Sequence, residues 1–294
     1  MREDDRQDLA IRIEDVVCRR RPDEAPVING MSLAVPKGQW LCVTGGNGSG
    51  KSTLVRLING LLAAEQGTIT VGGCLLRAET LWEVRKQVGV VFASPDDQFV
   101  GLTVADDLAF GLENRCLPQE EMQERISRVA AQLGIASLLD RHPGTLSGGQ
   151  KQRAALAAVL AMEPDILILD EAMSMLDAAS RRELLDWLTQ LRATGQYTMI
   201  SVTHDIEEMA AADRMIMMQD GQIAADGRPD ELLRDEELLR SHRIEIPFVV
   251  ALCNELKQRG LDIGEWTTEQ EAVHAIWALY STRYPTATRM DLAL

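Results

Sequence analysis

Eight residues at positions 45–52, GGNGSGKS, match the phosphate-binding template of Gly, any four residues, Gly, Lys and then Ser or Thr. They follow an apolar stretch at 40–43 and precede a helical pattern at 52–62, which is the order of strand, loop and helix that the template needs. Glycines allow backbone N–H groups to surround phosphate oxygens, Lys51 adds a positive charge, and the Ser52 hydroxyl suits Mg2+.

We therefore predict a nucleoside triphosphate site, and the alternative is a glycine-rich turn that binds nothing. The residues predicted to hold the nucleotide in this segment are Gly45, Gly46, Asn47, Gly48, Ser49, Gly50, Lys51, Ser52 and Thr53.

A second set of candidate residues follows the apolar strand at 166–169, where the sequence continues with Asp170 and Glu171. A parallel sheet presents ligands at the carboxyl ends of its strands, so Asp170 can hold Mg2+ directly or through water. Glu171 can point at the attacking water and polarise it. The alternative is that both residues are solvated surface acids, but the four apolar residues before them argue against a surface position.

Three further segments could contact a nucleotide. Residues 146–150 spell LSGGQ, and the backbone N–H groups of Ser147, Gly148 and Gly149 would form an anion site at a helix start. Residues 174–177 spell SMLD, and His204 follows an apolar strand at 198–202. Considered alone, His204 could be an ordinary histidine at the end of a strand.

In order and spacing, these segments together resemble those of ABC transporter ATPases. The resemblance implies that Ser147, Gly148, Gly149 and Gln150 face the γ phosphate of ATP held by another subunit, so that two chains close around each nucleotide. It also implies that His204 contacts the γ phosphate and that Asp177 links the two sites across the dimer. Glu171 and His204 are then the catalytic residues, while Ser52 and Asp170 hold the metal.

Within that family, the chain is most similar to the ATPases of energy-coupling factor transporters and to their cobalt and nickel relatives. The residues that carry this resemblance lie at 94–115, 174–177, 203–208 (THDIEE) and 244–249 (IEIPFV). It implies a peripheral ATPase on the cytoplasmic face of the membrane, bound to a transmembrane coupling subunit and a substrate-binding membrane subunit. Vitamin or other micronutrient uptake is the leading function, and cobalt or nickel import is the alternative within the class.

The chain departs from the family pattern at two positions. Ala93 stands where such ATPases place a glutamine that reaches Mg2+ and the attacking water, so hydrolysis is predicted to be slower but not abolished. Arg20 stands where an aromatic ring usually stacks on adenine; a guanidinium can also stack there, or the segment is a solvated basic turn. These departures favour a heterodimer with a related chain over a homodimer. They also leave open a low-turnover, nucleotide-gated scaffold subunit.

An acidic segment is predicted to face the membrane partner, because the family receives arginine-bearing cytoplasmic helices there and arginines pair with carboxylates. The acidic residues are Asp96, Asp97, Asp106, Asp107 and Glu113. An ordinary solvated acidic face is the alternative.

Composition argues against several other classes of protein. A formal net charge of -15 argues against nucleic acid as a partner, and so against a ribosome- or DNA-acting ATPase. Five scattered cysteines without a CxxC pair fit reduced thiols. No apolar run approaches the roughly 20 residues that a membrane span needs, and the N-terminus lacks the features of a signal peptide.

The elements that must position these residues alternate between strands and helices, which predicts an α/β fold of the P-loop NTPase type with a mostly parallel sheet. A small antiparallel sheet, with strands at 11–18 and 31–35, precedes the phosphate-binding loop. A helical subdomain is inserted at about 103–160. We expect an ATPase domain at 1–227 and a helical extension at 228–294, with helices at 230–239, 247–259 and 268–280. The family resemblance implies that this extension serves dimerisation.

Overall fold

The computed structural model describes residues 8–21, 23–242, 244–264, 266 and 269–283. The chain divides into two compact units, Met1–Asp226 and Gly227–Leu294. Every residue predicted to bind or hydrolyse ATP lies in the first unit. Among the described residues, no helix has the length and apolar character that a membrane span requires.

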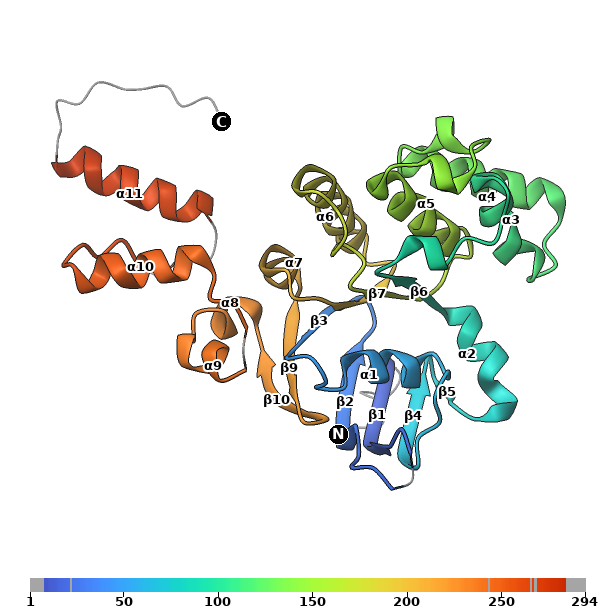
Figure 1. Ribbon diagram of the computed structural model, residues 1–294, viewed down its shortest axis with the longest axis horizontal. Coiled ribbons are helices and arrows are strands. Elements are labelled where there is room, and N and C mark those ends of the chain that lie inside the picture. Colours follow the sequence, from blue (N-terminus) through green and yellow to red (C-terminus); the bar gives the residue numbers. More distant parts are fainter. Residues whose placement is uncertain (1–7, 22, 243, 265, 267–268, 284–294) are drawn as a thin grey trace. The chain divides into compact units, whose positions relative to one another are not determined.

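A six-stranded sheet forms the centre of the first unit, with the strand order β10-β9-β3-β8-β7-β6 (Figure 1). Strand β3 lies between β8 and β9 and runs parallel to both, and β6, β7 and β8 are likewise parallel to their neighbours. The strands are β3 (Trp40–Thr44), β6 (Val88–Phe92), β7 (Ile166–Asp170), β8 (Thr198–Val202), β9 (Arg214–Gln219) and β10 (Gln222–Gly227). The expected mostly parallel sheet is confirmed.

A four-stranded antiparallel sheet has the order β2-β1-β4-β5, and its strands are β1 (Leu9–Cys18), β2 (Ile28–Pro36), β4 (Gln66–Val71) and β5 (Cys74–Leu75). It therefore combines the two strands before the phosphate-binding loop with two strands after it. A single hydrophobic core joins this sheet to the large one through α1 (Lys51–Ile58), since Ile11, Leu54 and Ile168 are buried in the same cluster.

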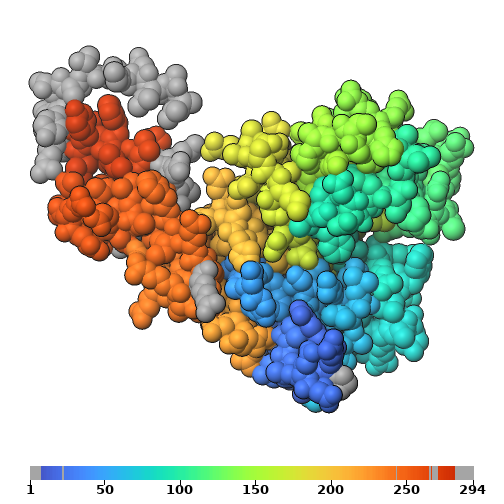
Figure 2. Space-filling model, in the orientation of Figure 1, coloured from blue at the N-terminus to red at the C-terminus, as the bar shows by residue number. Residues whose placement is uncertain are grey.

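Helices α3 (Val104–Glu113), α4 (Gln119–Gln132) and α5 (Gly148–Ala161) pack together as the helical subdomain. Figure 2 shows the green residues of this subdomain lying directly against the cyan residues around α2 (Leu81–Gln87). The remaining helices of the first unit are α6 (Ala178–Ala193) and α7 (Ile206–Ala211). Helix α6 follows β7, and α7 follows β8, so both begin near the carboxyl ends of parallel strands.

The second unit is entirely helical in its described part, with α8 (Pro229–Leu232), α9 (Glu236–Ser241), α10 (Phe248–Gln258) and α11 (Glu269–Arg283). Helices α10 and α11 pack on each other around a small core that contains Val249, Cys253, Ile263 and Ala272. Four large apolar side chains of α11 remain exposed: Val273, Ile276, Trp277 and Tyr280.

Two predicted helices end differently in the structure. The single helix expected at 230–239 is wrong: α8 ends at Leu232 and a new helix begins after Asp235, whose side chain accepts the Leu238 N–H at 2.9 Å. A local side-chain cap competes with helix continuation here. The helix expected to reach residue 62 ends at Ile58, because the chain turns at Gly60, whose φ of 65 degrees favours glycine. Thr268, predicted to start the last helix, lies outside the described residues.

Candidate active site

The phosphate-binding loop connects β3 to α1, and it is fixed to the core at both ends by glycines. Gly45 has a φ of 139, and a Cβ there would lie 2.2 Å from the Met218 carbonyl oxygen. Gly50 has a φ of 108, and a Cβ would lie 2.9 Å from the carbonyl oxygen of Val27. No side chain other than hydrogen fits either position. The loop is therefore held in one conformation by the strands beneath it.

The opposite side of the loop is open. A Cβ at Gly46 or Gly48 would meet no atom within 4 Å, which leaves space for a ligand to approach the backbone. Asn47 and Ser52 are exposed, Thr53 is buried, and the buried Ser49 Oγ has no hydrogen-bond partner among the described residues. A buried hydroxyl with no protein partner and an open row of glycines fit a loop that surrounds an oxygen-rich ligand.

Lys51 is only 6% exposed, and its Nζ donates to the carbonyl oxygens of Gly45 at 2.6 Å and Gly46 at 3.2 Å. Burial lowers the pKa of Lys51, while the charges of Glu171 and Asp170 act in the opposite direction. The ammonium group thus stands between its own loop and two carboxylates. It is positioned to neutralise an anion at this point.

The two carboxylates follow β7 because parallel strands end at the same edge of the sheet. Asp170 pairs in register with Phe92 on one side and with Val202 on the other. Burial raises the pKa of Asp170, the neighbouring Glu171 raises it further, and Arg56 and Lys51 oppose both effects. Asp170 is therefore a half-buried carboxylate whose charge is stabilised when a cation binds beside it.

Glu171 has a φ of 53, an uncommon value for a residue with a side chain. Its N–H donates to the Val202 carbonyl oxygen at 2.8 Å, and its carbonyl oxygen accepts hydrogen bonds from the Ser174 N–H at 3.0 Å and the Ser174 Oγ at 2.8 Å. The backbone is fixed on both sides while the side chain stays 41% exposed. Such conformations cluster at functional sites, where surrounding bonds maintain them.

His204 follows β8, and its Nε2 lies 4.0 Å from Glu171 Oε1. Burial lowers the pKa of His204, the Lys51 charge lowers it further, and Glu171 opposes them. The separation would suit an ion pair, but a lowered pKa leaves the imidazole neutral at pH near 7. We therefore describe this contact as a neutral ring beside a carboxylate, with one N–H free to donate to an anion.

The LSGGQ segment begins α5 with a reciprocal cap. Ser147 Oγ accepts the Gln150 N–H at 3.3 Å, and Gln150 Oε1 accepts the Ser147 N–H at 3.1 Å. Ser147 and Gly148 are exposed, whereas a Cβ at Gly149 would lie 2.7 Å from Ser180 Oγ. Among the described residues, no hydrogen bond or ion pair joins this helix start to the phosphate-binding loop of the same chain.

Residues 28–174 match the model of the family described as "ABC transporter". The chain belongs to the ABC transporter family. The energy-coupling factor transporter ATP-binding protein EcfA1 of Bacillus licheniformis is 47% identical over 277 residues, covering 94% of this chain and 99% of the relative. The corresponding protein of Bacillus subtilis is 48% identical over 278 residues, with the same coverage of 94% and 99%. The similarity of this ABC ATPase to proteins of that name therefore extends over nearly its whole length.

Solved structures agree with the fold of the ABC ATPase. CbiO1 from Clostridium perfringens, described as part of the ABC transporter complex cbiONQ, has a TM-score of 0.74 at 31% identity, covering 84% of this chain and 99% of that one. The ATP-binding cassette MJ0796, solved as a dimer in a post-hydrolysis state with ADP and Pi, has a TM-score of 0.68 at 24% identity over 74% of this chain and 98% of that one.

One chain of the ATPase brings together the phosphate-binding loop, Asp170, Glu171 and His204 at one sheet edge. Asp177 stands apart as the cap of α6, where its Oδ1 accepts the Ser180 N–H at 2.9 Å. Hydrogen bonds from Ser180 lower the pKa of Asp177. Arg20 is exposed after β1 and makes no hydrogen bond or ion pair with another described residue, so its predicted stacking on adenine stays a prediction.

Sequence reasoning missed two residues of the ABC ATPase that support this edge. Gln152 is 1% exposed and its Nε2 donates to the Phe92 carbonyl oxygen at 3.2 Å, directly before Ala93. Arg56 contributes a positive charge near Asp170. The signal for Arg56 was its spacing of four residues from Ser52, which places both on one face of α1. Gln152 stands between Lys151 and Arg153 in the polar first part of α5, so the sequence carries no signal that it is buried.

Proposed function

We propose that this ABC ATPase uses ATP with Mg2+ in an energy-coupling factor transporter and drives uptake of a vitamin or other micronutrient. The observation that carries the proposal is the arrangement of Lys51, Asp170, Glu171 and His204 around one open, glycine-lined loop. The near-full-length similarity to proteins named as energy-coupling factor ATP-binding subunits supports the transporter class.

The residues present fit a bound magnesium ion. The Ser52 hydroxyl is exposed at the start of α1, and Asp170 is a half-buried carboxylate at the neighbouring strand end. Oxygen ligands of this kind, with waters and phosphate oxygens, suit Mg2+. When bound, Mg2+ neutralises charge on the phosphate oxygens.

The chain's own residues then have separate roles. Lys51 exchanges its carbonyl partners, Gly45 and Gly46, for phosphate oxygens of ATP. Glu171 orients the attacking water, because its backbone is fixed and its carboxylate is exposed. Neutral His204 donates a hydrogen bond to the γ phosphate without adding a second positive charge beside Lys51. Positioning and electrostatic stabilisation account for most of the rate enhancement in phosphoryl transfer.

Hydrolysis requires two chains in this proposal. Ser147 and Gly148 are exposed at the start of α5. Among the described residues, neither forms a hydrogen bond with the phosphate-binding loop of its own chain. They are available to the γ phosphate held by another subunit. The partner is a related but different ATPase, since Ala93 and Arg20 leave this chain short of two usual contacts. The exposed apolar face of α11 supports dimerisation through the second unit.

A surface beside β6 is proposed to receive cytoplasmic helices of the transmembrane coupling subunit, which in turn contacts the substrate-binding membrane subunit. A small hollow of about 150 Å³ lies there, lined in part by Val100, Phe110 and Met162. Val100, Leu102 and Phe110 are 66%, 77% and 51% exposed. Exposed apolar side chains rimmed by acids are typical of protein interfaces. The ATPase thus reaches the cytoplasmic face of the membrane through its partners.

The acidic residues of this surface differ in their availability, and one prediction is wrong. Asp107 is 8% exposed, and its Oδ1 accepts the N–H groups of Val100 at 2.8 Å and Gly101 at 3.1 Å, so it supports the loop from inside. Asp106 caps α3 with Thr103. Asp96 pairs with Lys151 at 2.5 Å. Asp97 and Glu113 are exposed and remain available to a basic partner.

Glu171→Gln tests the proposed function in the complete transporter reconstituted in lipid vesicles. We expect ATP hydrolysis and substrate uptake to fall together by about 100-fold or more, with ATP binding retained, because the amide cannot polarise water as a carboxylate does. Glu207→Gln, which changes an exposed acid on α7, is the matched control and should leave both rates unchanged. Uptake that persists in Glu171→Gln would instead favour the low-turnover scaffold.

A further inference from the structure

A single guanidinium group joins two loops that border the active site. Arg181 lies in the first turns of α6, and its Nη1 donates to Asp205 Oδ2 at 2.9 Å. Its Nη2 donates to the Leu176 carbonyl oxygen at 3.2 Å. Leu176 belongs to the loop at 171–177 that runs from Glu171 to the cap of α6. Asp205 directly follows His204.

The Leu176 end of this bridge is part of a bonded turn. Ser174 is tied to the carbonyl oxygen of Glu171 by two hydrogen bonds, and the Leu176 N–H donates to the Met173 carbonyl oxygen at 3.2 Å. Asp177 then caps α6, and the Arg181 N–H donates to the Asp177 carbonyl oxygen at 2.9 Å. A shift of this loop would therefore move the Arg181 side chain with it.

The Asp205 end is equally constrained. Asp205 Oδ1 accepts the Glu208 N–H at 3.0 Å and caps α7, while the Asp205 N–H donates to Thr203 Oγ1 at 3.0 Å. The Thr203 N–H donates to the Val43 carbonyl oxygen at 3.2 Å. His204 lies between these two anchored residues, so its position follows that of Asp205.

Stability is a minor part of what this bridge contributes. The side chains of Arg181 and Asp205 are 34% and 19% exposed, and solvent weakens ion pairs of that kind. Arg181 Nε is buried and has no hydrogen-bond partner among the described residues, so the described hydrogen bonds of the guanidinium all go to these two loops. The bridge therefore constrains geometry more than it stabilises the fold.

We propose that Arg181 is a positioning residue that links the loop at 171–177 to the loop at 203–205, so that His204 adopts its working position only when the first loop is in place. The inference rests on the proposed function, in which the segment at 174–177 lies at the contact between two ATPase chains. Closure of the dimer would then be transmitted within one chain to His204. The guanidinium of Arg181 makes no hydrogen bond to the phosphate-binding loop among the described residues, so the link acts on turnover and leaves ATP affinity unchanged.

The test compares Arg181→Met with Arg182→Met in the assembled transporter. Arg182 is the exposed neighbour on the same helix, and its substitution removes a guanidinium without breaking the bridge. We expect Arg181→Met to lower kcat roughly tenfold while KM for ATP changes less than about twofold. Asp205→Asn retains an oxygen that can cap α7 and should lower kcat similarly. The double variant should be no slower than either single one, because both remove the same contact.

Amide hydrogen exchange of the isolated full-length chain provides a readout that does not depend on turnover. Asp205→Asn should raise exchange at Ser174 and Leu176 as well as in its own loop, and Arg181→Met should do so in both loops. Unchanged exchange at Ser174 and Leu176 in Asp205→Asn overturns the inference, as does an unaltered kcat for Arg181→Met in an active transporter. A wild-type transporter without ATPase activity would count against the proposed function, whereas the exchange result still decides the inference.

Discussion

At the scale of single residues, the site depends on how strand ends place a few polar side chains beside buried apolar ones. Asp170 ends β7 and pairs in register with Phe92, and Ala93 directly follows Phe92 at the end of β6. Asp170 contributes a carboxylate to this edge, but Ala93 contributes only a methyl group. In the proposed site, Ala93 therefore offers no oxygen to the metal or to the attacking water.

Ala93→Gln is predicted to raise ATP turnover roughly threefold to tenfold, because the glutamine side chain supplies an amide oxygen where the chain now has only a methyl group. Steady-state ATPase measurements on the assembled transporter provide the test. Ala93→Leu is the matched control, because leucine fills similar space but forms no hydrogen bond. A glutamine variant no faster than the leucine variant would show that water already replaces the missing group.

The buried carboxyl group of Glu208 makes the free energy of unfolding depend on pH. It is 2% exposed, and burial raises its pKa to about 7, although hydrogen bonds with Thr203 and Ser201 act in the opposite direction. The folded chain therefore holds a proton between the unfolded pKa of 4.5 and about 7. Because the folded state binds more protons there, the free energy of unfolding falls as pH rises through this window, by roughly 3 kcal/mol in all.

Glu208→Gln should remove this dependence. Urea unfolding measures the free energy of unfolding of the variant and of the parent chain at about pH 5 and about pH 8. The difference, variant minus parent, should be roughly 2 to 3 kcal/mol larger at the higher pH. Glu207→Gln, an exposed neighbour, should follow the parent at both values. Identical pH profiles for the parent and Glu208→Gln would mean that Glu208 is ionised throughout.

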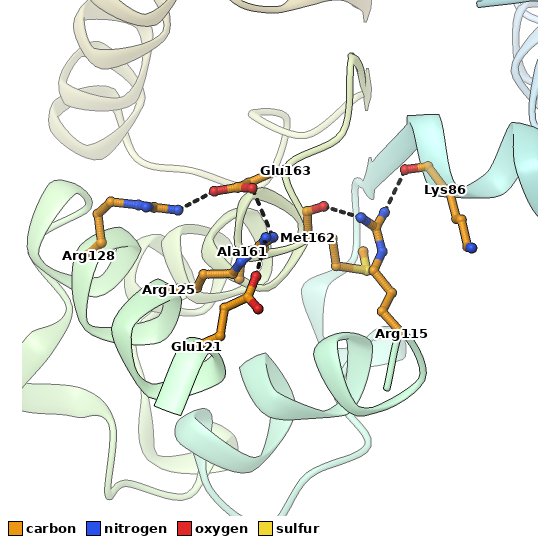
Figure 3. A network of polar contacts seen from close by, with 8 residues as sticks. All are labelled: Lys86, Arg115, Glu121, Arg125, Arg128, Ala161, Met162 and Glu163. Carbon is orange, nitrogen blue, oxygen red and sulfur yellow. Dashed lines mark hydrogen bonds and ion pairs between the residues drawn. The ribbon is translucent and has the colours of Figure 1, made fainter. Parts of the chain in front are cut away.

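At the scale of elements, α5 runs from the Ser147 cap to a polar network at its carboxyl end (Figure 3). Arg115 Nη1 donates to the Met162 carbonyl oxygen and its Nη2 to the Lys86 carbonyl oxygen, both at 2.5 Å. Arg125 and Arg128 both pair with Glu163, just beyond the helix. Arginines at a helix carboxyl end satisfy free carbonyl groups and complement the helix dipole. The network thus holds the far end of the helix that presents Ser147.

Arg115→Met is predicted to lower the free energy of unfolding by about 1 to 2 kcal/mol, because two carbonyl groups lose their donor. The guanidinium of Arg115 is partly removed from water, and this burial lowers its pKa. Arg128→Met is the control: Arg128 is 44% exposed, and loss of its ion pair should cost less than about 0.5 kcal/mol in urea unfolding. Equal losses in the two variants would contradict a special role for Arg115.

Sequence patterns predicted the strands and long helices well where apolar residues recur at a clear period. They missed α2 and α7, which are short and have few buried residues to show a period. They also misplaced Asp107, because an acidic residue is usually exposed and only the fold shows that it accepts two backbone N–H groups. The Arg181 bridge joins residues far apart in sequence, so no local pattern could indicate it.

At the scale of the whole molecule, the chain presents two adjoining surfaces for its partners. One surface carries Val100, Leu102 and Phe110 together with Asp97. The second carries the exposed start of α5, and it borders the first where Lys151 pairs with Asp96 at 2.5 Å. The first is proposed to bind the membrane subunit and the second to close on another ATPase chain.

Asp97→Lys should release the ATPase from its membrane partner, because an exposed acid that meets an arginine-bearing helix would become a like charge. Co-purification with the membrane subunits should fall at least about tenfold. Glu124→Lys changes an exposed acid on α4, away from the proposed surface residues, and should not affect assembly. Normal recovery of the Asp97→Lys complex would show that this acid is not at the interface.

The measurement that tests the central claim most directly is a structure of the transporter that contains the Glu171→Gln chain with ATP and Mg2+. The account predicts that two ATPase chains enclose the nucleotide, with Ser147 and Gly148 of this chain at hydrogen-bond distance from the γ phosphate in the partner's phosphate-binding loop. A nucleotide held by one chain alone, with Ser147 remote from any partner phosphate, would contradict it.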